Sequence, residues 1–142
     1  MASSLTVEVE AGLNEVYDLL LDLPSYPQWL SSIKKVEVLE KDGQSRPSKV
    51  ALSIEAGMLR DKPVLDYSWD GAPGVITFSL EDADLLTQMD GTYTLKAIDD
   101  STTSVTYELT TAVSMPVPQM MLTKAEEATI ALALKELKAK FE

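Results

Sequence analysis

Residues 118–142 read PQMMLTKAEEATIALALKELKAKFE, and this stretch decides how the rest of the chain must fold. It has no Gly or Pro after Pro118, and it is dominated by Ala, Leu, Lys and Glu, which favour helices. Pro116 and Pro118 give a stiff entry into a first helical turn. We therefore expect one helix of roughly 35 Å. Because that length matches the width of a small domain, the preceding residues must fold around this helix.

The predicted helix carries two apolar stripes. Bulky side chains recur at helical spacing in its second half: Ile130, Leu134, Leu137 and Phe141. Smaller or more flexible side chains form a second stripe, displaced around the helix: Met121, Ala125, Ala128 and Leu132. We interpret the first stripe as core. For the second, three interpretations stay open, namely core, the wall of a ligand cavity, and the contact of a homodimer.

Composition excludes several classes of function. The chain has 142 residues, and we expect residues 1–142 to form a single domain. It contains no Cys and no His, which removes thiolate chemistry, the usual general base near neutral pH and the commonest transition-metal ligand. A formal net charge of −11 argues against binding to a nucleic-acid backbone. We therefore expect no metal, no cofactor and no nucleic-acid partner.

Targeting signals are missing from the sequence as given. The N-terminal residues MASSLTVEVE have no basic segment followed by an apolar run, so we predict no signal peptide. No apolar stretch approaches the length that crosses a membrane. We expect a cytoplasmic protein with no stable membrane insertion.

The residues between 5 and 113 are dominated by strand patterns. Residues 5–9 alternate as a strand, residues 11–21 fit an amphipathic helix, and Pro24 and Pro27 frame a corner with a second, very short helix. Alternating runs separated by short turns then predict six more strands, at about 33–40, 50–58, 65–70, 75–81, 86–97 and 105–113. Gly57 and Gly91 suggest bulges. The predicted fold class is α+β, with a seven-stranded antiparallel sheet curved around the C-terminal helix and two short helices after the first strand.

Three stretches carry a resemblance to a known family. They are VEVEAGLNEVYDLLLDLPSYPQWLSSIKKVEVLEKD (7–42), DGTYTLKAIDDSTTSVTYEL (90–109) and ALALKELKAKFE (131–142). The chain resembles the START-like (SRPBCC) superfamily, specifically its bacterial polyketide cyclase/dehydrase and lipid-transport branch. This resemblance implies a helix-grip fold with a deep apolar cavity between sheet and terminal helix, where lipids, sterols, polyketides or isoprenoid quinones bind. It says less about function, because the superfamily includes carriers, receptors, cyclases and chaperone regulators.

Candidate ligand-binding residues are aromatic or pliable side chains facing the predicted cavity. A buried phenol or indole N–H needs a polar partner, and Met adapts to irregular ligands. The candidates lie on the concave face, in the corner after the first helix and on the second stripe: Trp29, Ile54, Met58, Tyr67, Trp69, Phe78, Met89, Tyr93, Tyr107, Met121, Ala125 and Ala128. We assign no catalytic residue and no metal ligand.

The predicted function is binding, transport or sensing of a hydrophobic small molecule that is lipid-, polyketide- or isoprenoid-like. One alternative is an aromatase/cyclase-type enzyme in which Tyr93 or Tyr107 acts with Arg60 to stabilise an enolate. Another is a protein-interaction module whose cavity is filled by its own side chains. No paired carboxylates or nucleophile–base motif stands out, so we expect binding rather than catalysis. We expect residues 60–62 to be a polar strand end at the cavity mouth, with contact to an anionic head group as an alternative role.

Overall fold

The structure is a computed structural model that describes residues 3–56 and 59–142, and strands make up nearly half of it. The chain begins with β1 (Ser3–Val9), α1 (Leu13–Leu21), a 3₁₀ turn η1 (Leu23–Ser25) and α2 (Tyr26–Trp29). Seven strands follow: β2 (Ile33–Lys41), β3 (Pro47–Ala56), β4 (Leu59–Asp61), β5 (Val64–Ser68), β6 (Val75–Asp82), β7 (Leu86–Asp99) and β8 (Thr102–Val113). The long helix α3 (Gln119–Lys140) ends the chain.

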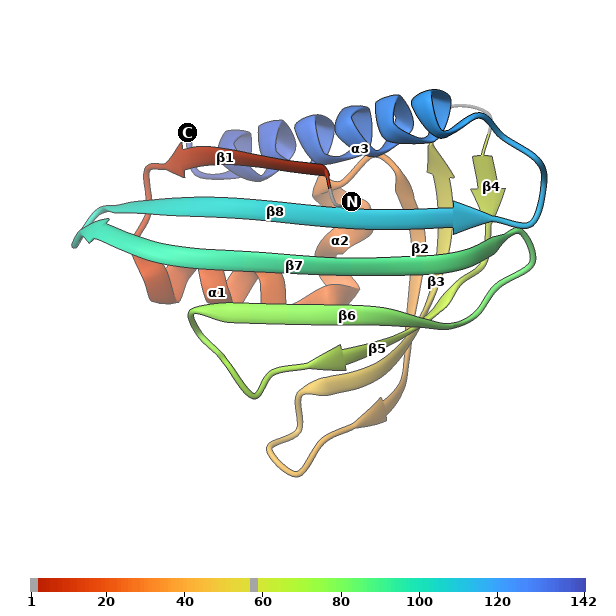
Figure 1. The fold of residues 1–142 in the computed structure, drawn as a ribbon. Helices are drawn as coiled ribbons and strands as arrows, with labels where there is room; N and C mark the ends of the chain where they lie inside the picture. Colours follow the sequence, from red (N-terminus) through yellow and green to blue (C-terminus); the bar gives the residue numbers. More distant parts are fainter. Residues whose placement is uncertain (1–2, 57–58) are drawn as a thin grey trace.

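All strands belong to one antiparallel sheet. Its order is β1-β8-β7-β6-β5-β3-β2, and the short β4 pairs with β3 off this path (Figure 1). From β2 to β8 the order is a meander of neighbouring strands, whereas β1 crosses over to pair with β8. The predicted α+β architecture is confirmed. The three-residue β4 was not predicted, because so short a strand leaves no readable alternation.

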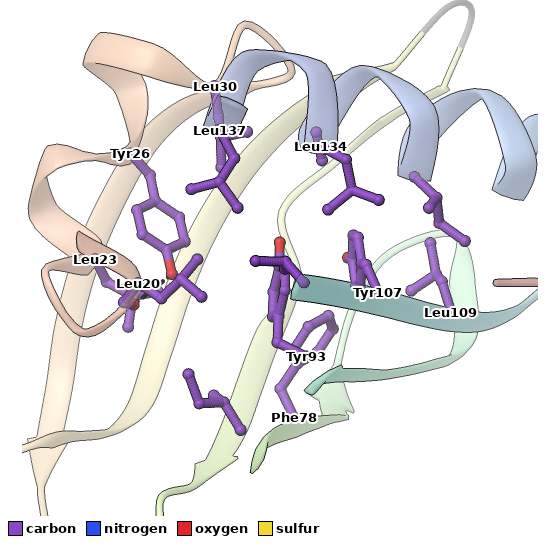
Figure 2. Packing of buried hydrophobic residues seen from close by; sticks show 14 of the residues in the cluster. Leu20, Leu23, Tyr26, Leu30, Phe78, Tyr93, Tyr107, Leu109, Leu134 and Leu137 are labelled. Atoms are coloured by element: carbon purple, nitrogen blue, oxygen red, sulfur yellow. Dashed lines mark hydrogen bonds between the residues drawn. The ribbon is translucent and has the colours of Figure 1, made fainter. Parts of the chain in front are cut away.

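Helix α3 lies along the sheet and packs mainly against β1 and β8 (Figure 1). The bulky stripe anchors it, because Ile130, Leu134 and Leu137 are all at most 1% exposed. Figure 2 shows Leu134 and Leu137 pointing from α3 toward the side chains of the sheet. The interpretation of the stripe as core is confirmed for these three residues, whereas Phe141 follows α3 and is only partly buried.

The corner formed by α1, η1 and α2 closes one end of the sheet's concave face. Val16 and Leu20 of α1 are buried. The Tyr26 hydroxyl donates to the Leu20 carbonyl and ties α2 back to α1 (Figure 2). This bond satisfies a polar group that burial would otherwise leave without a partner.

The predicted bulge at Gly91 is wrong. Gly91 pairs in regular register with Phe78 on one side and Leu109 on the other, and the irregularities of β7 lie near its two ends. A Cβ atom at Gly91 would lie 2.1 Å from Cζ of Phe78. The glycine therefore makes room for an aromatic ring rather than for an extra residue. The bulge expected at Gly57 falls outside the described residues.

Candidate functional site

A pocket of about 440 Å³ lies between the concave face of the sheet and α3. Strands β3 and β5–β8 contribute its floor and one wall, α3 contributes the opposite wall, and the α2–β2 corner closes one end. Strand alternation explains the lining, since Tyr107, Leu109, Thr111 and Val113 of β8 all face it.

Exposed lining residues mark where the pocket opens. On α3 these are Ala125, Ala128 and Leu132, the last with 41% of its surface exposed. Ser31, which donates its N–H and hydroxyl to Glu136 of α3, is also both exposed and part of the lining. Because α3 packs mainly against β1 and β8, its opposite flank is free to border this opening.

Eight of the twelve predicted ligand-binding residues line this one pocket. Five strands and α3 supply them: Ile54, Tyr67, Phe78, Met89, Tyr93, Tyr107, Ala125 and Ala128. Met58 falls outside the described residues. The remaining three, Trp29, Trp69 and Met121, are not part of the lining.

Both tryptophans are used in packing instead. Trp29 lies in the α2 corner, where its indole N–H donates to Ser25 Oγ at 3.3 Å. Trp69 follows β5, is 2% exposed, and donates its indole N–H to the Pro47 carbonyl at 2.6 Å. Its ring stacks on Tyr67 with centroids 5.5 Å apart, so it supports a lining residue from behind. The alternation of residues 65–69 suggested that Trp69 faces the cavity, but β5 ends at Ser68 and the chain turns there.

The second stripe of α3 is not core. Met121 is 61% exposed, and Ala125, Ala128 and Leu132 are exposed as well. The last three border the pocket, whereas Met121, in the first turn of α3, does not. Small side chains at Ala125 and Ala128 leave the space that bulkier ones would fill.

Three tyrosines bring hydroxyl groups to the pocket. Tyr93 and Tyr107 are cross-strand partners whose rings stack with centroids 4.2 Å apart, and Tyr67 packs against Phe78 at 5.3 Å. Figure 2 shows the Tyr93 hydroxyl directed toward α3. Burial raises the pKa of Tyr67, Tyr93 and Tyr107, so each phenol keeps its proton and acts as a neutral donor near neutral pH.

These donors are not all satisfied by the protein. The stacked pair allows at most one of Tyr93 and Tyr107 to donate to the other. The second O–H of the pair, and that of Tyr67, find no acceptor in the parts of the chain that the structure describes. Since no enclosed side-chain polar atom there lacks a partner, these hydroxyls open onto the pocket. They are placed to donate to an oxygen of a bound molecule.

Glu126 is a buried lining residue that the sequence interpretation missed. It is 3% exposed and accepts hydrogen bonds from Ser3 Oγ at 2.9 Å and from Thr111 N and Oγ1, both at 2.6 Å. Its carboxyl group thereby joins α3 to β1 and β8. The available signal was its position four residues before Ile130, which places it in line with the bulky stripe.

Residues 60–62 lie beside the pocket, at the end of β4, but are not part of its lining. The Arg60 side chain is 80% exposed and pairs with Glu55 at 3.0 Å, and it is not part of the lining. Asp61 is buried and accepts backbone N–H bonds from residues 62, 84, 85 and 86. It therefore fixes the β6–β7 connection. An enolate-stabilising arrangement of Tyr93 or Tyr107 with Arg60 is not present.

Comparison with known proteins assigns the family. The sequence model of the family described as polyketide cyclase/dehydrase and lipid transport matches residues 9–138. The chain belongs to this family. The resemblance noted from the sequence is thereby confirmed. No curated protein matches the chain.

Solved structures share the fold of this polyketide cyclase/dehydrase and lipid transport family member. A START superfamily protein from Mycobacterium smegmatis is 25% identical, with a TM-score of 0.94 over 99% of this chain and 96% of that one. The Zhui aromatase/cyclase from Streptomyces sp. R1128 is 19% identical, with a TM-score of 0.85 over 99% and 92% of the two chains. Among the described residues, no helix is both long and apolar enough to span a membrane.

Proposed function

We propose that this protein binds a hydrophobic small molecule in the pocket beneath α3 and carries or senses it. The observation that carries the proposal is a pocket of about 440 Å³ with a mainly apolar lining and a few converging phenol groups. Its volume falls in the range of about 300–1,000 Å³ that small-molecule sites occupy. The family's lipid-transport members and the START superfamily neighbour support this class of function.

Two kinds of lining group contribute to binding, namely apolar side chains and tyrosine hydroxyls. Apolar side chains such as Leu52, Leu65 and Leu109 supply affinity, at about 25 cal/mol per Å² of apolar surface removed from water. The hydroxyls of Tyr67 and the Tyr93–Tyr107 pair fix the orientation of the ligand. Entry is beside the exposed flank of α3, at Ala125, Ala128 and Leu132.

The pocket can be filled from α3 as a test. Ala128→Trp places a large ring in the pocket, and Ala139→Trp is the matched control, because Ala139 is exposed on the same helix and not part of the lining. We expect wild type and the control to carry a near-stoichiometric apolar compound when purified from the organism that encodes them. Native mass spectrometry and organic extraction should show about a tenfold loss in Ala128→Trp.

Two results would contradict this proposal. A wild-type protein that is empty and does not bind the neutral probe N-phenyl-1-naphthylamine contradicts it. Equal occupancy in Ala128→Trp and Ala139→Trp also contradicts it, since the molecule then lies elsewhere.

An aromatase/cyclase-type reaction is the second candidate. The observation favouring it is that neutral phenol donors from Tyr93 and Tyr107 face the pocket, where they can stabilise a developing oxyanion. Conversion of a linear poly-β-ketone that is lost in Tyr93→Phe, measured by mass spectrometry, supports this candidate. Recovery of the bound compound unchanged supports carriage. The free volume of the pocket gives no support to an interaction module filled by its own side chains.

A further inference from the structure

The charged side chains that line the pocket are all acidic. No Lys or Arg is among its described lining residues, although the chain contains 12 of them. The lining does include two carboxyl groups, those of Glu55 and Glu126. The N–H of Thr111 and the hydroxyls of Ser3 and Thr111 all bond to the oxygens of Glu126, so these oxygens already have protein partners.

The cation beside the lining is already paired with a lining carboxylate. Arg60 neighbours Leu59, a lining residue, but its side chain is 80% exposed and held by Glu55 at 3.0 Å. An anionic ligand would therefore be buried without a partner of opposite charge, next to Glu126, in a protein with a net charge of −11. Burying an unpaired charge is costly, and the protein's own field adds to that cost.

The polar groups that remain available in the pocket are mostly donors. The O–H of Tyr67 and at least one O–H of the Tyr93–Tyr107 pair have no protein acceptor in the described chain, and burial keeps them protonated. A ligand carbonyl satisfies such donors without bringing a charge into the pocket. Donors with no protein acceptor, in a lining without an unpaired cation, fit a ketone or quinone oxygen rather than a carboxylate or phosphate.

We propose that the pocket selects neutral, carbonyl-bearing hydrophobic molecules and excludes anionic ones such as free fatty acids and acyl phosphates. This inference rests on the proposed binding function and adds a rule of selection by charge. Apolar surface admits the carbon skeleton, the phenols recognise the oxygen, and the Glu126 carboxyl group, with no cation among the described lining residues, disfavours a negative head group.

Matched probes with one carbon skeleton test the rule by isothermal titration calorimetry at neutral pH. They are tridecan-2-one, the corresponding primary amine and the corresponding carboxylate. The amine controls for the loss of hydration that any charged group suffers. We expect the ketone to bind most tightly, the amine next, and the carboxylate about tenfold or more below the ketone.

A charge added to the pocket wall should change this order. In Ala128→Arg the guanidinium lies at the pocket, and carboxylate affinity should rise about fivefold or more, while Ala139→Arg adds the same charge outside the pocket and leaves the order unchanged. Wild-type binding of the carboxylate as tightly as the amine overturns the inference and leaves the binding function intact, as do equal effects of the two Arg variants. Failure of all three probes to bind overturns both proposals.

Discussion

At the scale of single residues, the shape of the pocket depends on a glycine that leaves room for an aromatic ring. Gly91 of β7 pairs with Phe78 of the neighbouring strand β6. Three atoms of the Phe78 ring lie within 2.8 Å of the place that a Cβ of residue 91 would occupy. Phe78 lines the pocket and contacts Tyr67 and Tyr107. Because Gly91 has no side chain, the Phe78 ring can occupy this position and contact the two tyrosines.

Gly91→Ala should therefore disturb both stability and binding. The new methyl group forces the Phe78 ring out of its place and into the pocket, at a cost of about 1–3 kcal/mol in the free energy of unfolding. Urea denaturation and titration with N-phenyl-1-naphthylamine measure the two effects. Gly43→Ala is the control, because nothing lies within 4 Å of its added Cβ. Similar behaviour of the two variants would show that the ring moves aside freely.

At the scale of elements, one carboxyl group fastens α3 to the sheet. Glu126 binds Ser3 of β1 and both donors of Thr111 in β8, and it lies in the half of α3 where the bulky stripe is absent. The second half of the helix is held by Ile130, Leu134 and Leu137. Hydrogen bonds to Glu126 thus hold the first half of α3, where small side chains border the pocket, whereas apolar packing holds the second half.

Glu126→Ala should loosen that end of α3. Removing the carboxyl leaves the Thr111 N–H without its partner, so we expect a loss of about 3 kcal/mol in the free energy of unfolding and faster hydrogen exchange at the Thr111 amide. Glu127→Ala is the matched control, since its neighbouring side chain is exposed, and should change stability by about 0.5 kcal/mol or less. An unchanged exchange rate at Thr111 would mean that the helix is held by packing alone.

Elements were predicted from sequence more reliably than the contacts between them. The alternation of Val105, Tyr107 and Leu109 is local, and it identified both the strand and the side that faces α3. The roles of Trp69 and Glu126 depend on partners 22 and 123 residues away, which no local period reveals. The candidate site was therefore predictable where a side chain's orientation follows from the strand, and not where a distant hydrogen bond decides it.

At the scale of the whole molecule, ionised aspartates hold three connections of the sheet. The backbone N–H of Arg46 holds the pKa of Asp42 below its ordinary value in the β2–β3 turn, and that of Ser101 does the same for Asp99 between β7 and β8. Burial by itself raises the pKa of Asp61, but four backbone N–H donors lower it overall. Protonation of these aspartates at low pH therefore weakens the hydrogen bonds of several connections at once.

The pH dependence of stability follows from the direction of these pKa shifts. A carboxyl whose pKa is lower in the folded state stabilises the fold above its unfolded value, about 3.9 for Asp, and this contribution is lost as the pH falls through the folded value. We expect the urea midpoint to fall steeply below about pH 4 in wild type and less steeply in Asp61→Asn, which cannot lose a charge at that site. Asp61→Asn should also be less stable near neutral pH, by about 2 kcal/mol, because the amide nitrogen cannot accept and two of the four backbone N–H groups lose their acceptor. The exposed Asp70→Asn serves as control and should follow the wild-type curve. If Asp61→Asn keeps the wild-type acid slope, the β6–β7 connection does not contribute to acid unfolding, and the two hairpin turns remain as its source.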